Sequence, residues 1–528
     1  MEAIANKLSW RRIRAWLRGD EGRRLLTCLA VSFAWGLIAH AFALLNPTLS
    51  HDSLYIYADA GEEAWKISLG RIFVPLYRQL LRGPLELPWV IGLLSFLWIG
   101  LALWLLCRLF DLRSLPMIAL TGGVLSVNLT VIAQIGTYLY EMDFDMFALL
   151  MAVLGVWLWR RNLDRGWRVL LAALPVTVAV GIYQSYISVS IVLAMIACML
   201  DLLRGTPVKA VLINGLKAVG VILLGGALYF LLLKLVTLLG GVALSSGGYN
   251  SLDNALKASD MSLSRRIRYT WLKSGIHYMT DTPVTVGSEG LMLAVNGLFW
   301  LCGGLAVLEA MLSRKLRIGA KLLFAALGLL LPFGANVAYF LNRDVHMLML
   351  YAIWLVYLLV LLVLRWWAQA ESRASRALRL WTRNLGALLL AVILCSNVLT
   401  ANGVYMKKTL EREATLSLMT RVADQLEETE GYIAGETPVA ILGTNVARDT
   451  LPGFEALTEV TGASHALQIT HRNSVNNYFT YVLNLPINLV SSEETLALEA
   501  SEAVQAMPVF PARGSIADMD GVLAVKLG

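Results

Sequence analysis

Long apolar runs, separated by short loops that carry Arg or Lys, fill the chain up to residue 402. A helix needs about 20 mainly apolar residues to cross roughly 30 Å of hydrocarbon, and the runs have this length and pattern. The sequence therefore predicts a polytopic α-helical membrane protein with about eleven transmembrane helices. The predicted spans are 25–46, 88–107, 115–135, 145–160, 168–182, 185–203, 214–239, 290–312, 320–340, 347–365 and 384–402.

Composition agrees with this pattern and argues against other classes of protein. Of the 528 residues, 57% are hydrophobic and 15% are charged, whereas a soluble domain is about 25% charged. The net charge of +7 comes from basic residues spread over loop ends rather than gathered on one face, so we expect no nucleic-acid partner. All five cysteines fall within apolar runs, which indicates neither a disulfide framework nor a zinc site.

The loop charges also predict the orientation of the chain. With the basic, amphipathic lead-in 1–24 in the cytoplasm, every loop that alternation assigns to the inner side carries at least two Arg or Lys residues. Eleven spans then place the hydrophilic tail, 403–528, outside the cytoplasm. That tail contains an amphipathic helix, the short apolar strand TPVAILG and a terminal strand, which together predict a small α/β or α+β domain.

Two segments of the transmembrane part (25–402) that are assigned to the outer side are long, 47–87 and 240–289. Apolar residues recur at helical spacing over 65–80, which predicts an amphipathic helix lying in the membrane interface and contacting lipid. The second segment combines a Gly/Ser-rich stretch with a basic, aromatic helix. In the first helix three arginines share one face and a proline is expected to kink or divide it: Arg71, Arg78, Arg82 and Pro75.

The first candidate functional group is acidic and lies in the first outer segment. Asp52 and Asp59 are seven residues apart, and Asp59 and Glu63 are four apart, so a helix would place them on one face. A carboxylate beside the neighbouring aromatic residues could take the proton of a sugar hydroxyl as a general base. Alternatively, Asp52 caps a helix and the glutamate is simply solvated.

A second acidic group precedes the fourth span. Glu141, Asp143 and Asp145 fall within five residues, with no basic partner nearby in the sequence. A carboxylate that caps the next helix would explain one of them but not three, so we expect at least one to bind substrate. Tyr183 and Gln184, at the tip of a predicted hairpin, could bind a polar ligand or could satisfy the backbone of their own turn.

A third group is basic and lies in segments assigned to the outer side, against the positive-inside trend. A guanidinium fork matches phosphate oxygens, so binding of a donor phosphate would explain these residues. The alternative is that the arginines reach lipid headgroups, which we expect of Arg78 and Arg82. No Walker loop or dinucleotide fingerprint is present, so a nucleotide is not expected as the direct substrate. The phosphate-binding candidates are Arg71, Arg265, Arg266, Arg268 and Arg343, with His346 nearby as a substrate-binding residue.

Several motifs, taken in order along the chain, resemble one family. HDS at 51–53 is followed by LGR at 69–71, then by the acidic EMDFD, the hairpin IYQSY, the late NRD and the closing MPVFPARGSI…VKLG. In their order and topology they resemble the bacterial membrane glucosyltransferases of the serotype-converting O-antigen type, within the GT-C superfamily.

The resemblance implies a specific reaction. Such enzymes take a sugar, here expected to be glucose, from a polyprenyl-phosphate-linked donor and pass it with inversion to a cell-envelope glycan, at the outer face of the bacterial cytoplasmic (inner) membrane. GT-C transferases generally carry a catalytic acid in the first outer loop, which corresponds here to Asp52, with Asp59 or Glu63 as alternatives. Charge on the leaving phosphate would be stabilised by Arg71, Arg343 or the arginines of SRRIR.

The sequence does not determine which glycan is the acceptor or whether a metal ion takes part. The sizeable tail and the 240–289 loop depart from the Gram-negative examples, so O-antigen, teichoic acid, another wall polymer and a glycoprotein are all candidate acceptors. We expect the tail to help hold that acceptor. Acidic clusters could bind a divalent metal, but no ligand set requires one, and no other cofactor is implied.

Three rival functions use the same features. A lipid-linked oligosaccharide transporter would suit many spans and buried polar groups, but the sequence shows no repeated halves. A glycan polymerase or ligase usually has one dominant outer loop, whereas the candidate acids here are dispersed over two outer segments. A structural scaffold whose tail recruits partners would tolerate replacement of the loop acids.

Overall fold

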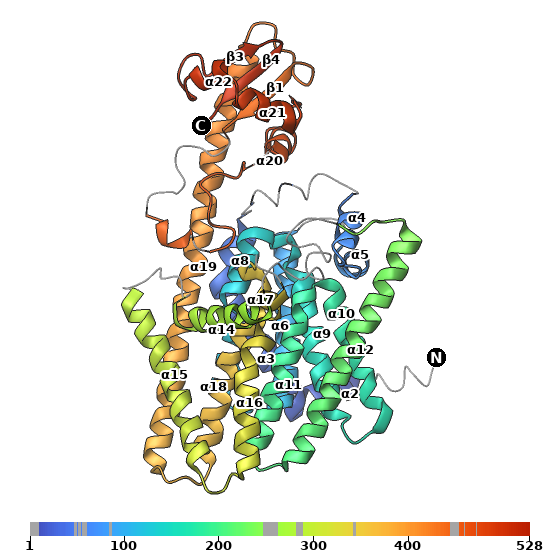
Figure 1. Ribbon diagram of the computed structural model, residues 1–528, viewed down its shortest axis with the longest axis vertical. Coiled ribbons are helices and arrows are strands. Elements are labelled where there is room, and N and C mark those ends of the chain that lie inside the picture. The colour runs from blue at the N-terminus through green and yellow to red at the C-terminus, as the bar shows by residue number, and fades with distance from the viewer. Residues whose placement is uncertain are drawn as a thin grey trace. The chain divides into compact units, whose positions relative to one another are not determined.

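The long apolar runs are helical in the computed structural model of the chain (Figure 1). Contacts divide the chain into two compact units. The structure describes residues 10–46, 50, 54, 61–83, 87–245, 262–280, 289–341, 345–443, 453–458, 460–470 and 472–528. The helical unit comprises 1–41, 63–131 and 141–399, and the C-terminal unit comprises 42–62, 132–140 and 400–528.

Within the described residues, nine helical stretches are long and apolar enough to cross a membrane. One of them, Leu115–Arg161, contains two predicted spans, and the shorter apolar stretch Gly166–Ile182 covers another. The mainly helical class is therefore confirmed, and its long apolar helices are compatible with a polytopic membrane protein, while the number of crossings stays a prediction. The helices of these apolar stretches are α3 (Asp20–Leu45), α6 (Pro88–Phe110), α7 (Leu115–Ser126), α8 (Leu129–Tyr138), α9 (Met142–Arg161), α10 (Ala173–Ile182), α11 (Ile187–Leu203), α12 (Val208–Gly240), α15 (Glu289–Leu312), α16 (Ile318–Ala335), α18 (Tyr351–Gln369) and α19 (Arg376–Glu427). Further helices lie outside these stretches: α2 (Trp10–Arg18), α4 (Gly61–Ser68), α5 (Val74–Tyr77), α14 (Leu263–Thr280) and α17 (Val337–Leu341).

The predicted span 115–135 is interrupted at Asn128, between α7 and α8. The Asn128 side chain serves both helix ends, because its amide donates to the last turn of α7 at 2.9 Å and its oxygen accepts from the first turn of α8 at 3.1 Å. Side chains of Tyr351 and His40 bind two further carbonyls at the end of α7, at 2.6 and 2.8 Å. Buried backbone groups need such partners, so one asparagine and two distant side chains stabilise the break.

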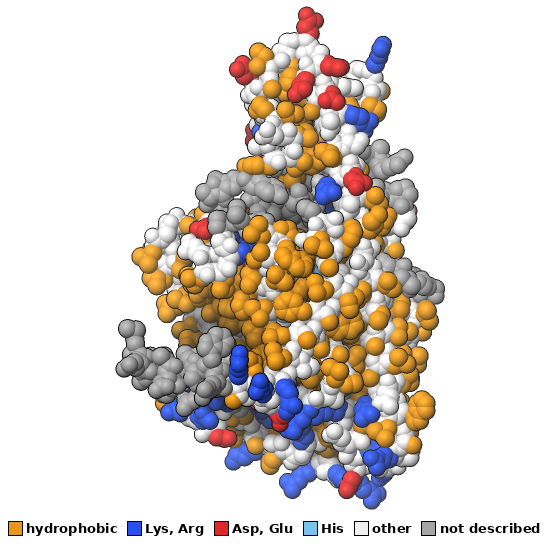
Figure 2. All heavy atoms as spheres, turned by 180° about the vertical axis from the view of Figure 1, so that it is seen from behind, with side chains coloured by type: hydrophobic (Ala, Val, Ile, Leu, Met, Phe, Trp, Pro, Cys, Tyr) orange, Lys and Arg blue, Asp and Glu red, His pale blue; other side chains and the backbone are white. Residues whose placement is uncertain are grey.

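Basic side chains gather at one end of the helical unit, while the flanks of its long helices are apolar (Figure 2). Ion pairs join the loops at this end: Lys315 contacts Glu371, and Arg365 lies 3.9 Å from Asp111. These are loops that the charge pattern assigned to the inner side. Basic loops gathered at one end are what the predicted orientation requires. The orientation itself stays a prediction.

The amphipathic helix predicted over 65–80 is not continuous. α4 ends at Ser68, a turn follows, and α5 begins at Val74 and continues into a π-helical turn, Arg78–Arg82. Pro75 lies in the first turn of α5, where a missing N–H is tolerated because it would have no partner within the helix. The prediction of one interfacial helix is therefore wrong, and the prediction that Pro75 divides the segment is confirmed.

The turn that follows α4 packs against the predicted hairpin between α10 and α11. α10 ends at Ile182, and Tyr183 is extended before the chain turns into α11. The Phe73 amide donates to the carbonyl of Gly181 at 3.1 Å. A Cβ atom on Gly181 would lie 2.5 Å from the Phe73 ring, so only glycine permits this close approach.

α19 runs without interruption through both units. The sequence predicted a span that ends at residue 402 and a separate helix after it. Gly403 does not end the helix, because the buried face continues beyond it: Val404 and Tyr405 are 0% exposed. Packing of that face outweighs the roughly 1 kcal/mol that a glycine costs within a helix.

One sheet lies in the described part of the C-terminal unit, with the strand order β2-β1-β4-β3. β1 pairs in parallel with β2 and β4, while β3 and β4 pair antiparallel. β1 occupies the apolar run TPVAILG, because both faces of a central strand are covered. The strands are β1 (Pro438–Leu442), β2 (Asn488–Leu489), β3 (Ile516–Met519) and β4 (Val522–Lys526), and the helices are α20 (Arg472–Asn477), α21 (Ser492–Glu499) and α22 (Glu502–Ala506).

The C-terminal unit is assembled from three separate stretches of chain. Leu54 is fully buried in a core that it shares with α19, β1 and β4. Ser50 donates to the carbonyl of Thr137 at 2.6 Å. Gly462, with φ +87°, approaches Thr137 so closely that any Cβ would collide with it. The described residues on either side of Asp52 are therefore fixed within this unit.

The closing motif MPVFPARGSI…VKLG connects the last strand to its surroundings. The Phe510 amide donates to the carbonyl of Lys526 at 2.8 Å. The Lys526 ammonium donates to the carbonyls of Val504, Gln505 and Met507 at 3.1, 2.9 and 2.9 Å. A cation at the C-terminal end of a helix stabilises the exposed carbonyls there. These motif residues therefore hold α22 and β4 together.

Candidate active site

A buried group of charged side chains lies where α4 and its following turn meet the start of α9. Glu141 accepts hydrogen bonds from both Lys66 and Arg71, the latter at 2.7 Å. The side chains of Lys66, Arg71 and Glu141 are 4%, 11% and 7% exposed, so these ion pairs are shielded from water. A predicted phosphate-binding arginine and a predicted substrate-binding acid are thus in direct contact.

The Arg71 side chain is held from a second direction by the hairpin between α10 and α11. Its guanidinium carbon lies 4.6 Å from the centre of the Tyr183 ring, a cation–π contact. Gln184 donates to the carbonyl of Leu69 at 2.9 Å, and Tyr229 donates to the next carbonyl at 3.1 Å. Gln184 therefore satisfies the backbone of the turn that carries Arg71, rather than that of its own turn.

A second charge pair involves the next residue along the acidic motif. The Arg82 Nη1 atom lies 3.6 Å from Asp143 Oδ1, and both side chains are 0% exposed. Arg78 is also buried. The prediction that Arg78 and Arg82 reach lipid headgroups is therefore wrong. A buried guanidinium needs a counter-charge, and Asp143 supplies it for Arg82.

Tyr77 connects this pair to α6. The Trp98 indole donates to the Tyr77 hydroxyl at 2.9 Å, and the Tyr77 and Phe144 rings meet edge to face at 6.1 Å. Burial raises the pKa of Tyr77 well above its usual range, and the nearby Asp143 carboxylate raises it further. The phenol therefore stays protonated at physiological pH and remains a hydrogen-bond donor.

The third acid, Asp145, is buried and interacts electrostatically with Glu141, Arg71 and Lys66. Capping does not explain the acids: the N-cap position of α9 is Glu141, and its side chain makes no cap hydrogen bond. All three acids belong to one buried group, called the ionic cluster below. The ionic cluster consists of Lys66, Arg71, Arg82, Glu141, Asp143 and Asp145.

The ionic cluster and the basic loops lie at opposite ends of α9. This helix of 20 residues begins beside the cluster at Met142 and ends at Arg161, next to a loop assigned to the inner side. Twenty helical residues span about 30 Å, the thickness of the hydrocarbon layer. The cluster is thus at the level expected for a membrane surface, with apolar helices below it.

Other predicted site residues do not enter the cluster. Glu63 is exposed on α4, and Arg265 and Arg268 are exposed on α14, which packs on α15, α16 and α17. Arg266 and His346 are partly buried. Three predicted residues lie outside the described part of the chain: Asp52, Asp59 and Arg343.

Sequence reasoning missed Lys66 and assigned Arg82 to lipid. Lys66 precedes Arg71 by five residues in a predicted outer segment, so the argument that selected Arg71 applied to it equally. Tyr77 and Tyr229 offered no comparable signal, because an aromatic residue in an apolar segment more often packs in the core.

The acidic clusters raise the question of whether side chains in the described part of the chain could bind a metal ion. Among them, no three His, Cys, Asp or Glu side chains form a group that could hold a metal ion. Positive charge beside the acids comes instead from Lys66, Arg71 and Arg82. These three basic side chains are the groups of the cluster that could contact an anionic substrate.

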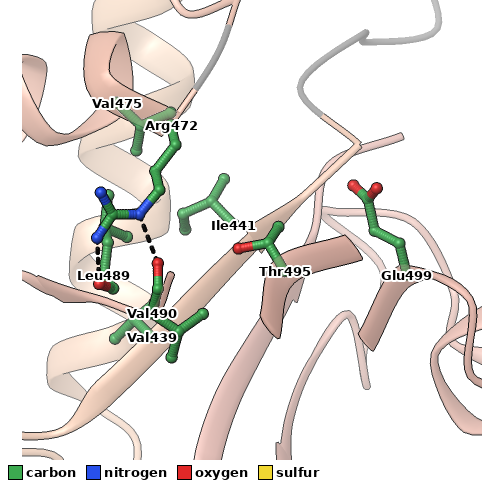
Figure 3. A pocket seen from close by; sticks show the side chains of 8 residues that line it. All are labelled: Val439, Ile441, Arg472, Val475, Leu489, Val490, Thr495 and Glu499. Carbon is green, nitrogen blue, oxygen red and sulfur yellow. Dashed lines mark hydrogen bonds between the residues drawn. The ribbon is translucent and has the colours of Figure 1, made fainter. Parts of the chain in front are cut away.

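A small cavity of about 80 Å³ is present in the described part of the C-terminal unit (Figure 3). Arg472 borders it and donates to the carbonyls of Leu489 and Val490 at 2.6 and 2.5 Å. Thr495 and Glu499 of α21 also line it, and the remaining lining is apolar. Since the bonds of Arg472 tie α20 to β2, its role in the fold is structural.

Comparison with known proteins gives one match. A family model described as Glucosyl transferase GtrII matches residues 41–420. The matched range contains the whole ionic cluster and ends within α19, before the sheet. No curated protein and no solved structure matches the chain.

Proposed function

Because the chain belongs to the GtrII glucosyltransferase family, we propose that it transfers glucose from a polyprenyl-phosphate carrier to a glycan of the cell envelope. Glucosyl transfer follows from the family. The proposal adds the carrier, an inverting reaction, and a location at the outer face of the bacterial cytoplasmic membrane. In this orientation the N-terminus is cytoplasmic and residues 403–528 lie outside.

The observation that carries the proposal is the position of Arg71. Glu141 binds its guanidinium and the Tyr183 ring packs against it, so the charge is oriented before substrate arrives. Oriented charge in a site shielded from water stabilises a developing negative charge more strongly than solvated charge does. The leaving group of a polyprenyl-phosphate sugar is a phosphate, which a guanidinium fork matches. We therefore assign Arg71 and Lys66 to the donor phosphate.

The level of the cluster supports a lipid-linked donor. A polyprenyl chain is apolar and belongs in the hydrocarbon, whereas its phosphate belongs at the surface. The ionic cluster lies at one end of α9, whose 20 residues match the hydrocarbon thickness. The phosphate and the cluster would therefore meet at the same depth.

The proposed reaction needs a base for the acceptor. A carboxylate takes the proton of an acceptor hydroxyl while that oxygen attacks the anomeric carbon. The bond from the anomeric carbon to the phosphate oxygen breaks, and its electron pair leaves with polyprenyl phosphate. We propose Asp52 as the base, with Asp59 or Glu63 as alternatives. The burial of Ser50 and the exposure of Glu63 favour Asp52.

The acids of the cluster have a different proposed role. Glu141 and Asp143 orient Arg71 and Arg82, which they contact. Asp145 is proposed to accept hydrogen bonds from glucose hydroxyl groups. Further substrate contacts are proposed for Arg343 and His346, while the exposed Arg265 and Arg268 gain no support from the cluster.

Family membership favours this function over its rivals. A lipid-linked oligosaccharide transporter or a scaffold would not need a glucosyltransferase family pattern over 41–420. A polymerase or ligase would also use lipid-linked sugars. It would join glycan chains, however, rather than add single glucose residues, so the size of the product separates the two.

The test is glucose transfer by the purified protein in detergent. Polyprenyl-phosphate-glucose and a panel of envelope glycans are supplied, and released polyprenyl phosphate is measured. We expect Arg71→Lys to lower kcat by about 10²–10³, the loss typical of one donor to a developing oxyanion. Asp52→Asn should lower it by about 10²–10⁴. The matched control is Arg113→Lys, whose side chain is 73% exposed in a loop assigned to the inner side.

Three results would contradict parts of the proposal. Transfer that proceeds at the wild-type rate in Arg71→Lys would remove the phosphate assignment. Movement of lipid-linked sugar across vesicles, without release of polyprenyl phosphate in the presence of any acceptor, would show a transporter instead. Intact transfer in both Asp52→Asn and Asp59→Asn would leave Glu63 or another group as the base.

A further inference from the structure

α19 carries a buried group of charged residues that the proposed reaction does not use. Lys407, Lys408 and Glu411 are 0%, 1% and 1% exposed. They lie on the buried side of the helix, between the fully buried Val404 and Met419. Because burial of an ionised side chain is expensive, a group of three within one turn of helix needs an explanation.

The contacts of the two lysines differ. Lys408 forms an ion pair with Glu411 at 3.1 Å. Lys407 donates to the backbone carbonyl of His465. In the described part of the chain, two buried ammonium groups thus share one buried carboxylate. A buried charge without a counter-charge costs several kcal/mol, so, as far as the described residues go, an added anion beside Lys407 and Lys408 would be stabilised.

The C-terminal unit has further buried polar groups, one of them on α19 itself. Thr415, one turn beyond Glu411, accepts from the backbone amide of Gln468 at 2.9 Å, and both residues are 0% exposed. Tyr478 is also fully buried, and within the described structure its hydroxyl makes no hydrogen bond. Arg412 acts electrostatically on that hydroxyl. A buried hydroxyl that lacks a partner costs about 1–3 kcal/mol and is a ready donor to an incoming anion.

We propose that Lys407 and Lys408 bind a negatively charged group, a phosphate or a carboxylate, carried by the acceptor glycan. The inference rests on the proposed function. The donor phosphate is assigned to Arg71 in the helical unit, whereas both lysines belong to the C-terminal unit, as do Ser50 and Leu54, the described residues nearest in sequence to the proposed base Asp52. The base acts on the acceptor hydroxyl, so the unit that contains these neighbours is the one expected to hold the acceptor.

The proposal narrows the substrate class. Of the acceptors that the sequence left open, it selects acidic polymers, in which phosphate or uronic-acid groups recur along the chain. A neutral glycan would offer no anion to Lys407 or Lys408. Recognition of a charge beside the accepting sugar would also orient the polymer, because an ammonium–anion contact fixes one point and the hydroxyl at the base fixes another.

The test compares three oligosaccharide probes of similar length: a glycerol-phosphate oligomer, a glucuronic-acid oligosaccharide and a neutral glucan. Binding to the full-length protein in detergent is followed by the shift in its thermal unfolding, over a range of probe and salt concentrations. We expect at least one acidic probe to bind in a salt-sensitive manner and the neutral glucan to bind weakly. Lys407→Met should lower the affinity for that acidic probe by roughly ten- to hundredfold, the effect of losing a hydrogen bond to a charged group.

Matched variants separate binding from folding. Lys209→Met removes a lysine that is exposed at the start of α12, and it should leave the binding of all three probes unchanged. Lys407→Arg keeps the charge and should retain most of the binding. Lys407 donates to a backbone carbonyl, and Glu411 keeps its ion pair with Lys408 in Lys407→Met, so this variant is expected to fold. If Lys407→Met does not fold, Lys408→Met is used in its place, and the same loss of affinity for the acidic probe is expected.

Three outcomes would overturn the inference. In the first, Lys407→Met binds every acidic probe like the wild type. In the second, the wild type binds acidic and neutral probes equally. In the third, Lys407→Met weakens binding of polyprenyl phosphate and not of the acidic oligosaccharides, which would assign the lysines to the donor. Glucose transfer is measured in the same preparation: transfer by the wild type together with any of these results removes this inference and leaves the proposed function intact.

Discussion

Two motifs that carry the glucosyltransferase resemblance place their charged residues in contrasting surroundings. In EMDFD, Glu141 and Asp143 bind basic side chains that come from a separate segment of the chain. In the closing motif, Lys526 donates to three backbone carbonyls at the end of α22. Charge that meets charge in a buried place is suited to a substrate, whereas charge that meets nearby backbone is suited to holding a fold together.

The contrast can be tested, because the two kinds of residue should separate stability from catalysis. Loss of an acid in the ionic cluster should affect both properties. Loss of Lys526 should affect stability alone. An exposed ion pair at the opposite end of the helical unit should affect neither, and it provides the baseline for both.

The largest effect is expected for Glu141→Gln. The substitution leaves Lys66 and Arg71 buried without the carboxylate that binds both, so we expect a loss of about 3–5 kcal/mol in the free energy of unfolding together with loss of transfer. Thermal unfolding in detergent and glucose transfer are the measurements. The double variant Lys66→Met with Glu141→Leu should recover part of the stability without activity. A Glu141→Gln protein with wild-type stability would mean that the ion pairs contribute nothing to the fold.

A smaller effect, confined to stability, is expected for Lys526→Met. It removes an ammonium that binds three carbonyls, which should lower the free energy of unfolding by about 1.5–3 kcal/mol. The kcat of the folded fraction should stay unchanged, measured against active-site concentration rather than total protein. A folded Lys526→Met with a reduced kcat would place this lysine near the substrate and remove the contrast between the two motifs.

The smallest effect is expected for Glu371→Gln. Lys315 donates to Glu371 and lowers the pKa of this carboxyl, and both side chains are largely exposed. A lowered pKa gives stability that is present above the unfolded pKa and is lost as the pH falls through the folded pKa. Wild type and variant should therefore have the same Tm at acidic pH and differ little at neutral pH, because solvent screens the pair. A large difference at neutral pH would show that loops at this end contribute more than exposure suggests.

The sequence predicted the helices better than their interruptions. Hydrophobic runs locate helices because burial or lipid contact requires about 20 apolar residues whatever the neighbours are. The break at Asn128 could not be predicted in the same way, since it depends on Tyr351 and His40 from other helices. The continuity of α19 across Gly403 depends likewise on which face is buried.

The sequence predicted individual residues of the candidate site but not which of them contact each other. Arg71, Glu141 and Tyr183 were selected by residue type and by their place in predicted loops, and the structure brings them into contact. Arg82 was assigned to lipid because a local pattern cannot show that Asp143 lies beside it. The choice of Asp52 as base stays a prediction, supported by the placement of its neighbours.

The C-terminal unit has a consequence for how the protein is made. Leu54 and the 132–140 stretch leave the ribosome long before α19 and the sheet, yet they are buried against partners from 400–528. Within the sheet, β4 is the last strand to be synthesised and lies between β1 and β3. Early segments of the chain must therefore wait for late ones. During that delay the apolar side chains of the early segments lack the partners that later bury them.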